Sequence, residues 1–430
     1  MDEKELDKFV EDQYKTWCDN NDISKVEDID EKHLKESIEK DLAFVSKMTV
    51  QEYTLYEKWI EVHEKYKTAE TNSFFDDKPA LVDPTQEAFI KSVKNNIWIP
   101  ESPEDIEKLE PVLEFTDDTE YNFKGQAKRG DLSEKWNTLR TFLSTMKNNS
   151  NIGRQMFFIV KDNRSGKYLG VICISGDFMD LTPRDNYIGW DRDIKTFKGK
   201  INHTAIGSSI VPTQPLGYSF TGGKLLAYLC LSDDVQRLWK EKYGDILAGV
   251  TTTSLYGSFS QYQNLKYWKK RGHSAGSVSY EATKPTIQML RKWIMENHTR
   301  KYFEWYSATK PTGQPYKRDH RNRSHTFAYS KLNIPKELTK SDHSRGIYFS
   351  TLYDNTREFL REEIPEDKLV KSFDSSVSAL SELWRERYAK KRINSLIDQK
   401  RTNMETLYYD DLIHLSWEET KNKYLNQVGR

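Results

Sequence analysis

The sequence predicts an α+β protein whose core is of the α/β type, with a mixed sheet flanked by helical regions. Three observations predict this class. Residues 1–95 are rich in Glu, Lys, Asp and Leu and almost free of glycine, which favours helices. Residues 156–271 alternate short apolar runs with amphipathic segments. Residues 373–427 are charged and helical in pattern. The expected parts are an acidic helical region (1–95), a linking mixed segment (96–150), the core (151–283) and a basic, mostly helical region (284–430).

The order of elements in the core is the main evidence for the mixed sheet. Met156–Val160 and Tyr168–Ile174 are apolar runs around a turn that contains Gly166, and this pattern predicts a β-hairpin. The expected elements that follow are a strand over Thr204–Val211, a helix over Leu225–Tyr243, a strand over Ile246–Thr252, a short helix over Gln261–Arg271 closed by Gly272, and a return strand over Ile347–Leu352. The strand–helix–strand part implies a parallel pair with a right-handed crossover.

Composition excludes several classes of protein. Hydrophobic residues make up 36% of the 430 residues, and aromatic residues 13%, which is enough for a core and excludes full disorder. The mean hydropathy is −0.82, and no apolar run approaches 18 residues, so no transmembrane span is expected. The first residues are acidic, so no signal peptide is expected either. Three scattered cysteines argue against a disulfide framework and favour a reducing, cytoplasmic location.

The zero net charge hides an uneven distribution along the chain. Residues 1–40 carry 14 acids and 7 bases, whereas residues 151–300 carry 21 bases and 12 acids. Residues 301–360 add 11 bases against 6 acids. A basic middle suits a polyanion such as nucleic acid or a phosphorylated cofactor, and it is equally consistent with an ordinary solvated surface.

A glycine-containing loop before the helix is the candidate cofactor site. A strand ends near Val211 and a helix begins near Gly222, where free backbone N–H groups and the helix dipole favour an anion. Glycine allows a phosphate close to the backbone, and a lysine adds a positive charge. The loop matches neither the Walker A nor the G-x-G-x-x-G pattern, so a flexible helix start is the alternative. The candidate cofactor-binding residues are Thr221, Gly222, Gly223 and Lys224.

The element order resembles the core of the GNAT acyltransferase fold. In that family a Q/R-x-x-G-x-G/A loop at this junction holds the pyrophosphate of acetyl-CoA, and Thr221-Gly222-Gly223-Lys224-Leu225 resembles a degenerate version of it. The resemblance therefore implies acetyl-CoA or a related acyl donor as cofactor. The segment lacks the leading Gln/Arg and the alternating glycines of the family loop.

Short motifs over about residues 150–280 resemble two narrower families. The I-G-W of Ile188-Gly189-Trp190, the pair Asn202-His203, the W…Y-G helix end from Trp239 and the W-x3-G-x3-G closure from Trp268 resemble the DruA family of Druantia anti-phage systems. The Gly153-Arg154-x-Met-Phe-Phe entry resembles Mom-type phage proteins, which are GNAT-like and modify adenine in DNA. These resemblances imply a protein that handles or modifies DNA in a phage or anti-phage context.

The candidate catalytic residues follow mostly from the GNAT resemblance. A GNAT commonly uses a tyrosine after the last core strand as general acid, and acyl transfer also needs a base. The candidates are His203, Ser254, Tyr256, Tyr262 and Tyr267. Tyrosines at such positions are more often core aromatic residues, and most histidines at strand starts are surface or hydrogen-bonded residues. No motif supports a specific metal.

Two basic segments are candidate DNA contacts. The first is Lys266–Arg271, which contains no acid and is expected on the short helix before Gly272. The second is Lys317–His325, the densest basic run, which follows several aromatic residues. Cations beside aromatic side chains suit a phosphate backbone with an extruded or unpaired base. The candidates are Lys266, Lys269, Lys270, Arg271, Lys317, Arg318, Arg321 and Arg323.

The sequence thus favours a group transferase that resembles Mom and acts on a base in DNA, with an acyl donor at Gly222 and Gly223. One alternative is a DNA-binding component of a defence system that resembles DruA and has no transferase activity. Another is a GNAT acting on protein or small-molecule amines. A transferase is expected to have an open cofactor slot beside the two glycines, whereas a binding protein is expected to have that slot filled by side chains such as Tyr218, Phe220 or Trp268.

Overall fold

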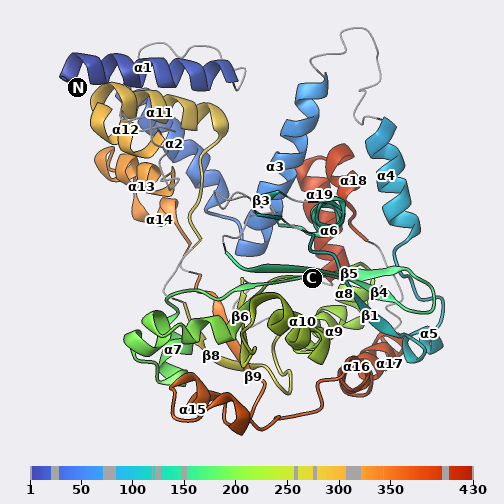
Figure 1. Cartoon of the computed structure of the whole chain (residues 1–430). Coiled ribbons are helices and arrows are strands. Elements are labelled where there is room, and N and C mark those ends of the chain that lie inside the picture. Colours follow the sequence, from blue (N-terminus) through green and yellow to red (C-terminus); the bar gives the residue numbers. More distant parts are fainter. Residues whose placement is uncertain are drawn as a thin grey trace. The chain divides into compact units, whose positions relative to one another are not determined.

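The computed structural model describes most of the chain, and its helices and strands are shown in Figure 1. The described residues are 2–20, 29–70, 84–118, 120–121, 127–128, 130–146, 153–255, 260–274, 278–306, 321–341, 343–399 and 406–428. The chain divides into two compact units. The helical unit consists of Met1–Val50 and Ser277–His343, and the sheet unit consists of Gln51–Gly276 and Ser344–Arg430. The helical unit therefore joins two segments that are far apart in sequence.

The helical unit is built from amphipathic helices. In α1 the buried residues Val10, Tyr14 and Cys18 recur every four positions, so one stripe of the helix faces its neighbours α11 and α12. In α2 the buried stripe packs against α11 in the same way. The helices are α1 (Glu3–Asn20), α2 (Glu31–Val45), α11 (Lys284–Asn297), α12 (Thr299–Tyr306), α13 (Arg321–Lys331) and α14 (Lys336–Thr339).

The sheet unit is centred on a seven-stranded sheet with the order β1-β4-β5-β6-β7-β9-β8. The strands are β1 (Pro111–Phe115), β4 (Gln155–Asp162), β5 (Tyr168–Gly176), β6 (Thr204–Pro212), β7 (Gly249–Ser254), β8 (Lys269–His273) and β9 (Gly346–Thr351). Only β6 and β7 are parallel, and the other neighbours are antiparallel. A separate pair is formed by β2 (Glu120–Tyr121) and β3 (Ala127–Lys128). The mixed α+β class, the hairpin, the parallel pair and the return strand β9 are as predicted.

Both faces of this sheet are covered, which explains the continuous apolar runs in β4 and β5. Phe158 and Ile172 pack toward α9 and α16, whereas Phe157 and Val171 pack toward Trp136 of α6. Side chains alternate between the two faces of a strand, so a strand buried on both faces is apolar throughout. Figure 1 shows α9 and α10 on one face of the sheet and α6 on the other.

The remaining helices of the sheet unit lie along its sequence as follows. Before the core are α3 (Val50–Glu70), α4 (Pro84–Asn95), α5 (Pro103–Glu107) and α6 (Asp131–Leu143). Within the core are α7 (Thr182–Ile188), the π-helix η1 (Asp193–Phe197), the 3-10 helix η2 (Lys200–His203), α8 (Leu216–Phe220), α9 (Gly222–Leu229) and α10 (Asp233–Tyr243). After β9 are α15 (Thr356–Leu360), η3 (Glu366–Lys368), α16 (Val377–Trp384), η4 (Arg385–Ala389), α17 (Lys390–Asp398), α18 (Tyr409–His414) and α19 (Trp417–Val428).

The structure corrects the predicted helix over Gln261–Arg271. Residues Lys269–His273 form the strand β8, which pairs with β9 at the edge of the sheet. Gly272 does not cap a helix. It comes directly after a register shift between β8 and β9, and its φ is +145°, a conformation that residues other than glycine rarely adopt. The predicted helix over Leu225–Tyr243 is also two helices, α9 and α10, separated near Ser232.

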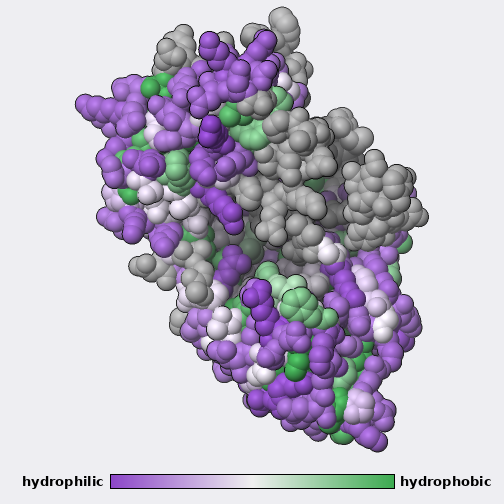
Figure 2. Space-filling model, turned by 60° about the vertical axis from the view of Figure 1, so that its left-hand side comes forward, coloured by the Kyte–Doolittle hydropathy of each residue, from purple (hydrophilic) through white to green (hydrophobic). Residues whose placement is uncertain are grey.

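Figure 2 shows one face of the molecule, on which the described residues are mostly hydrophilic and the hydrophobic residues form small separate patches. Every helix in the described part of the chain is too short or too polar to cross a membrane.

Candidate nucleic-acid interface

A groove in the sheet unit runs between α7 and the edge strand β8. Its volume is about 520 Å³. Gly272 brings β8 close to α7, because a Cβ on this residue would lie 3.2 Å from the Cβ of Pro183. The residues that line the groove are Thr182, Pro183, Asn186, Tyr187, Lys270 and Arg271. The groove therefore combines an aromatic ring with two cations.

Two arginines meet on the ring of Tyr187. The guanidinium carbon of Arg271 lies 3.3 Å from the ring centroid, and that of Arg357, on α15, lies 5.1 Å from it. Among the described residues, neither arginine forms an ion pair, and the Nε of Arg271 is buried without a hydrogen-bond partner. Burial lowers the pKa of Arg271, the interaction and hydrogen bond with Tyr187 oppose this effect, and the like charge of Arg357 adds a smaller lowering. The site thus holds two positive charges together without a carboxylate between them.

Backbone contacts hold α15 beside α7. The indole Nε1 of Trp190 donates to the carbonyl of Leu360 at 2.8 Å. An Nη of Arg361 donates to the carbonyl of Ile188 at 3.1 Å. Both bonds join the end of α7 to α15, and they fix the distance between Tyr187 and Arg357.

The other end of α7 is anchored by a buried ion pair. Asp177, which directly follows β5, and Arg184 of α7 approach to 2.6 Å, and neither side chain is exposed. The hydroxyl of Thr251 on β7 donates to the second carboxylate oxygen of Asp177 at 2.7 Å. Burial raises the pKa of Asp177, whereas the charge of Arg184 opposes this effect. The pair connects the ends of β5 and β7 to α7.

Further polar contacts extend this anchor to η1. Arg184 donates to Asp185 and, at 2.7 Å, to the carbonyl of Phe178. Lys195 of η1 is buried and pairs with Asp185 at 2.9 Å and with Asp180 at 3.0 Å. Side chains with locked neighbours hold a binding site in a defined geometry. The anchor therefore positions Tyr187 for the groove.

The predicted cofactor loop is packed against the chain's own residues. Gly222 and Gly223 are buried, and a Cβ would collide with Leu216 at the first and with the side chain of Gln261 at the second. Lys224 donates to the carbonyls of Gln261 at 3.1 Å and Gln263 at 2.6 Å. Burial lowers the pKa of Lys224 to about 8. The chain's own side chains therefore occupy the positions into which a Cβ on either glycine would point.

Thr221 and Trp384 complete this packing. Thr221 has a left-handed φ of 58° and ends α8 as α9 begins. Its carbonyl accepts a hydrogen bond of 3.0 Å from the indole of Trp384. The side chains that meet the loop are thus Leu216, Gln261 and Trp384, whereas the indole of Trp268 donates to the carbonyl of Ala227 on α9.

The predicted catalytic residues lie in separate places. The Nδ1 of His203 is 2.9 Å from the carbonyl of Ile246, and burial lowers the pKa of this histidine. Tyr262 is buried, which raises its pKa to about 12. Tyr267 stacks on Phe373 at 3.8 Å between ring centroids.

Ser254 and Tyr256 complete the predicted set. The Oγ of Ser254 is buried without a hydrogen-bond partner. Tyr256 lies outside the described residues. Among the described candidates, no hydrogen bond or ring contact joins two of these side chains, so the structure assembles no acid–base pair from them.

The predicted DNA contacts are divided between the two units. Lys266 is exposed beside Tyr267, and Lys269 and Lys270 are exposed on β8, not on a helix as predicted. Lys317 and Arg318 lie outside the described residues, and Arg321 begins α13. Arg323 is exposed on α13 of the helical unit. Of the predicted DNA contacts, Lys270 and Arg271 line the groove, and Arg271 also lies on the ring of Tyr187.

Sequence reasoning missed Tyr187 as the ring on which Arg271 lies. The motif Tyr187-Ile188-Gly189-Trp190 carries a family resemblance, but its pattern does not mark a binding element. Arg357 and Arg361 are four positions apart, and this spacing predicts a shared helix face that could extend a phosphate track. The structure places Arg357 on α15 beside Tyr187, whereas Arg361 follows the helix and bonds to Glu363 and to the carbonyl of Ile188. Asp177 and Arg184 match no catalytic or binding motif, although a carboxylate directly after a buried strand is a usable signal.

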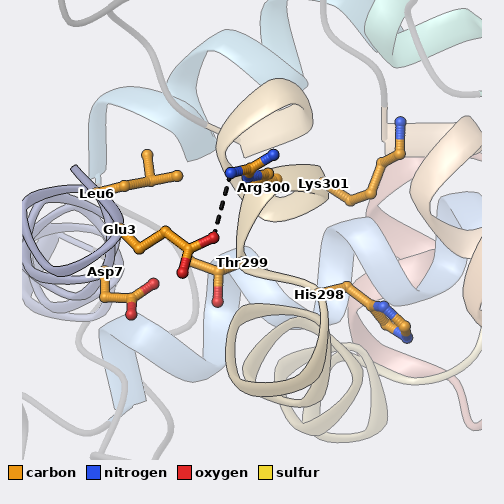
Figure 3. Close-up of a pocket in the computed structure, with 7 residues that line it drawn as sticks. All are labelled: Glu3, Leu6, Asp7, His298, Thr299, Arg300 and Lys301. Carbon is orange, nitrogen blue, oxygen red and sulfur yellow. Dashed lines mark hydrogen bonds and ion pairs between the residues drawn. The ribbon is translucent and has the colours of Figure 1, made fainter. Parts of the chain in front are cut away.

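A second hollow lies in the helical unit, between α1 and the corner of α11 and α12 (Figure 3). Its volume is about 370 Å³. Glu3 pairs there with Arg300 at 3.3 Å, and Asp7 lies beside them. The acids offset the basic residues, so this hollow is less suited to an anion than the groove beside Tyr187.

The fold and the groove define an α+β protein with a basic surface site. A sequence model of the family described as "Druantia protein DruA" matches residues 128–362, more than half of the chain. The chain therefore belongs to the DruA family. It is 25% identical over 272 residues to the Druantia protein DruA of Escherichia coli (strain UMEA 4076-1), an alignment that covers 59% of this chain. The chain spans 62% of the length of that relative. No solved structure matches the chain. The family match includes the groove, the anchor and Arg357.

Proposed function

We propose that the chain is a DNA-binding component of an anti-phage defence system, and that the groove between α7 and β8 contacts the phosphate backbone. The observation that carries this proposal is the pair of arginines on Tyr187. Membership of the DruA family supports the defence context. All residues of the groove lie within the region that matches the family.

The arginine pair suits a phosphate for three reasons. Guanidinium groups bind phosphate through two parallel hydrogen bonds. Among the described residues no carboxylate forms an ion pair with either arginine, so an anion meets no competing acid partner on the ring of Tyr187. An anion also relieves the repulsion between Arg271 and Arg357, which are both positively charged in the unbound protein.

A simpler explanation for part of this charge is the position of β8. Edge strands often carry lysines, which prevent pairing with other chains. That explanation accounts for Lys269 and Lys270, whose side chains are exposed. It does not account for Arg271, which folds onto Tyr187, or for Arg357, which comes from a different element.

The test is fluorescence anisotropy of a labelled DNA oligonucleotide over a range of salt concentrations. Arg271→Gln and Arg357→Gln are each expected to weaken binding about tenfold, and to reduce the slope of log affinity against log salt by about 1 for each phosphate that is no longer neutralised. Arg164→Gln is the control. It removes the same charge from the exposed turn at the opposite end of β5. Equal effects of the three substitutions would contradict the proposal.

The defence context needs a cellular test. Bacteria that carry the chain together with the other proteins of a Druantia system are expected to reduce phage plating. Arg271→Gln in the same cells is expected to restore plating, while Arg164→Gln leaves it reduced. If both variants lose protection, the loss with Arg271→Gln cannot be attributed to DNA binding at the groove.

A base-modifying transferase that resembles Mom is the second candidate. The parallel pairing of β6 and β7 supports it, because the GNAT resemblance requires such a pair. The packing of Gly222 and Gly223 against Leu216 and Gln261 argues against an acyl donor at the predicted loop. The test is nucleoside mass analysis of DNA from cells that express the chain. A new nucleoside mass would establish the transferase, and unmodified DNA would exclude it in those cells.

A further inference from the structure

We propose that the surface beside the groove binds unpaired bases, so that the preferred ligand is single-stranded or locally unpaired DNA. This inference rests on the proposed function and names its substrate class. The surface consists of Phe178, Met179 and Phe197, and we call these three residues the apolar ridge. Their exposed fractions are 48%, 52% and 81%.

The three side chains belong to two segments that the structure ties together. Phe178 and Met179 lie in the connection between β5 and α7, and Phe197 ends the π-helix η1. The hydroxyl of Thr196 contacts the sulfur of Met179 at 3.8 Å, and Lys195 pairs with Asp180 at 3.0 Å. The three residues therefore form one surface feature. Packing into the core does not explain why these side chains are apolar, because all three are exposed.

The ridge is continuous with the groove. The chain passes from Met179 through Leu181 directly to Thr182, the first residue that lines the groove. The same anchor, Arg184, bonds to the carbonyl of Phe178 and carries the helix of Tyr187. The first residues of the ridge are therefore only a few positions from the first residue of the groove, and the same anchor holds both.

The charges around the ridge suit a base and not a phosphate. Lys195 is paired with Asp180 at 3.0 Å and Lys198 with Glu362 at 2.7 Å, so carboxylates already offset these two cations beside the ridge. Phosphates are accommodated at Arg271 and Arg357, where no described acid pairs with the cations. Proteins that bind single strands combine such a basic groove with exposed aromatic rings on which bases stack.

Base pairing decides which DNA can use both features. The bases of a duplex are stacked inside the helix, so their faces do not reach Phe178 or Phe197. An unpaired strand presents base faces and phosphates at once. The ridge therefore predicts a preference for the single strand, while the groove alone predicts none.

The experiment compares a labelled single-stranded 20-mer with the blunt duplex of the same sequence, using the full chain. Phe197→Ala is expected to weaken single-strand binding about tenfold and to leave duplex binding within about twofold, because only an unpaired base stacks on the ring. Phe197→Trp is expected to keep the affinity. Ile397→Ala is the control, because Ile397 is another exposed apolar residue of the sheet unit, on α17.

A fluorescent base provides a second readout. 2-Aminopurine placed within the single strand is expected to change its emission on binding to the unchanged chain, and to lose that change with Phe197→Ala. The thermal stability of the variant should equal that of the unchanged chain, because Phe197 is 81% exposed.

The outcomes separate this inference from the proposed function. If Arg271→Gln weakens binding to both DNAs but Phe197→Ala affects neither, the ridge is not a base-binding surface and the groove remains. If Phe197→Ala weakens both DNAs equally, the preference for unpaired bases is overturned. If the unchanged chain binds neither DNA, the proposed function itself fails.

Discussion

Asp177 and Arg184 form an ion pair of 2.6 Å in which neither side chain has exposed surface. The pair joins the end of β5 to α7, and Thr251 of β7 bonds to the same carboxylate at 2.7 Å. Two fully buried charges are costly unless their geometry is good and their remaining hydrogen bonds are made. The other guanidinium nitrogens of Arg184 donate to Asp185 and to the carbonyl of Phe178, whereas the Nη1 that faces Asp177 makes a close ion contact without hydrogen-bond geometry. The arrangement is therefore an anchor that fixes α7, and it places Tyr187 between the two arginines of the groove.

Removal of one partner should be strongly destabilising. Asp177→Asn leaves the charge of Arg184 buried with only Asp185 to oppose it, so the free energy of unfolding should fall by about 3 kcal/mol. Urea unfolding at pH 7 measures this loss. The double variant Asp177→Leu with Arg184→Met removes both charges and should be more stable than Asp177→Asn alone. A loss below about 1 kcal/mol for Asp177→Asn would show that the pair is not an anchor.

The glycine loop should behave as a packing element. Gly223→Ala places a methyl group against the side chain of Gln261, so we expect a loss of about 1–3 kcal/mol in unfolding free energy. Gly176→Ala is the control, because Gly176 has no left-handed φ and its added Cβ would make only ordinary contacts, the nearest at 3.7 Å. Acetyl-CoA is expected to leave the melting temperature of the unchanged chain as it is. A rise that Gly223→Ala abolishes would restore the loop as a cofactor site.

Much of the sheet could be predicted because its signals are local. The two apolar runs from Met156 and from Tyr168 enclose a short turn, and their pairing needs no distant partner. The parallel pair of β6 and β7 follows from the strand–helix–strand order within the same part of the chain. Both features are built from segments that are close in the sequence, so the local pattern is enough to predict them.

The groove could not be predicted because its parts meet only in the folded chain. The segment Lys269–His273 is basic and lacks the β-branched residues typical of a strand, and it becomes one because β9, far downstream, pairs with it. Tyr187, Arg271 and Arg357 come from three separate elements and share no motif. Long-range pairing overrides local propensity here, and the sequence carries no periodic signal for it.

Lys224 should make stability depend on pH in the alkaline range. Its pKa is lowered by burial to about 8 in the folded chain, below its ordinary value of 10.5. Between these two values the unfolded chain binds more protons, so the free energy of unfolding should rise as the pH increases from about 8 toward 10. Lys224→Met should remove this contribution. Parallel unfolding curves at several pH values measure the difference, and identical pH slopes for both proteins would contradict the expectation.

Arg357 should show opposite effects on stability and on binding. Its charge repels that of Arg271 across the ring of Tyr187, and no described ion pair offsets this repulsion. Arg357→Gln should therefore leave the free energy of unfolding unchanged within about 0.5 kcal/mol or raise it slightly. The same substitution should weaken DNA binding about tenfold, because the phosphate no longer has this charged donor. Thermal unfolding and anisotropy on the same preparations measure both quantities.

Tyr187→Leu tests the ring separately from the charges. It removes the surface on which both guanidinium groups lie, so it should weaken DNA binding and make the effects of Arg271→Gln and Arg357→Gln smaller. Double variants measured by the same anisotropy titration give this coupling. If Arg357→Gln lowered stability and binding together, the arginine would be a structural residue of α15, and the ring of Tyr187 would not carry an anion site.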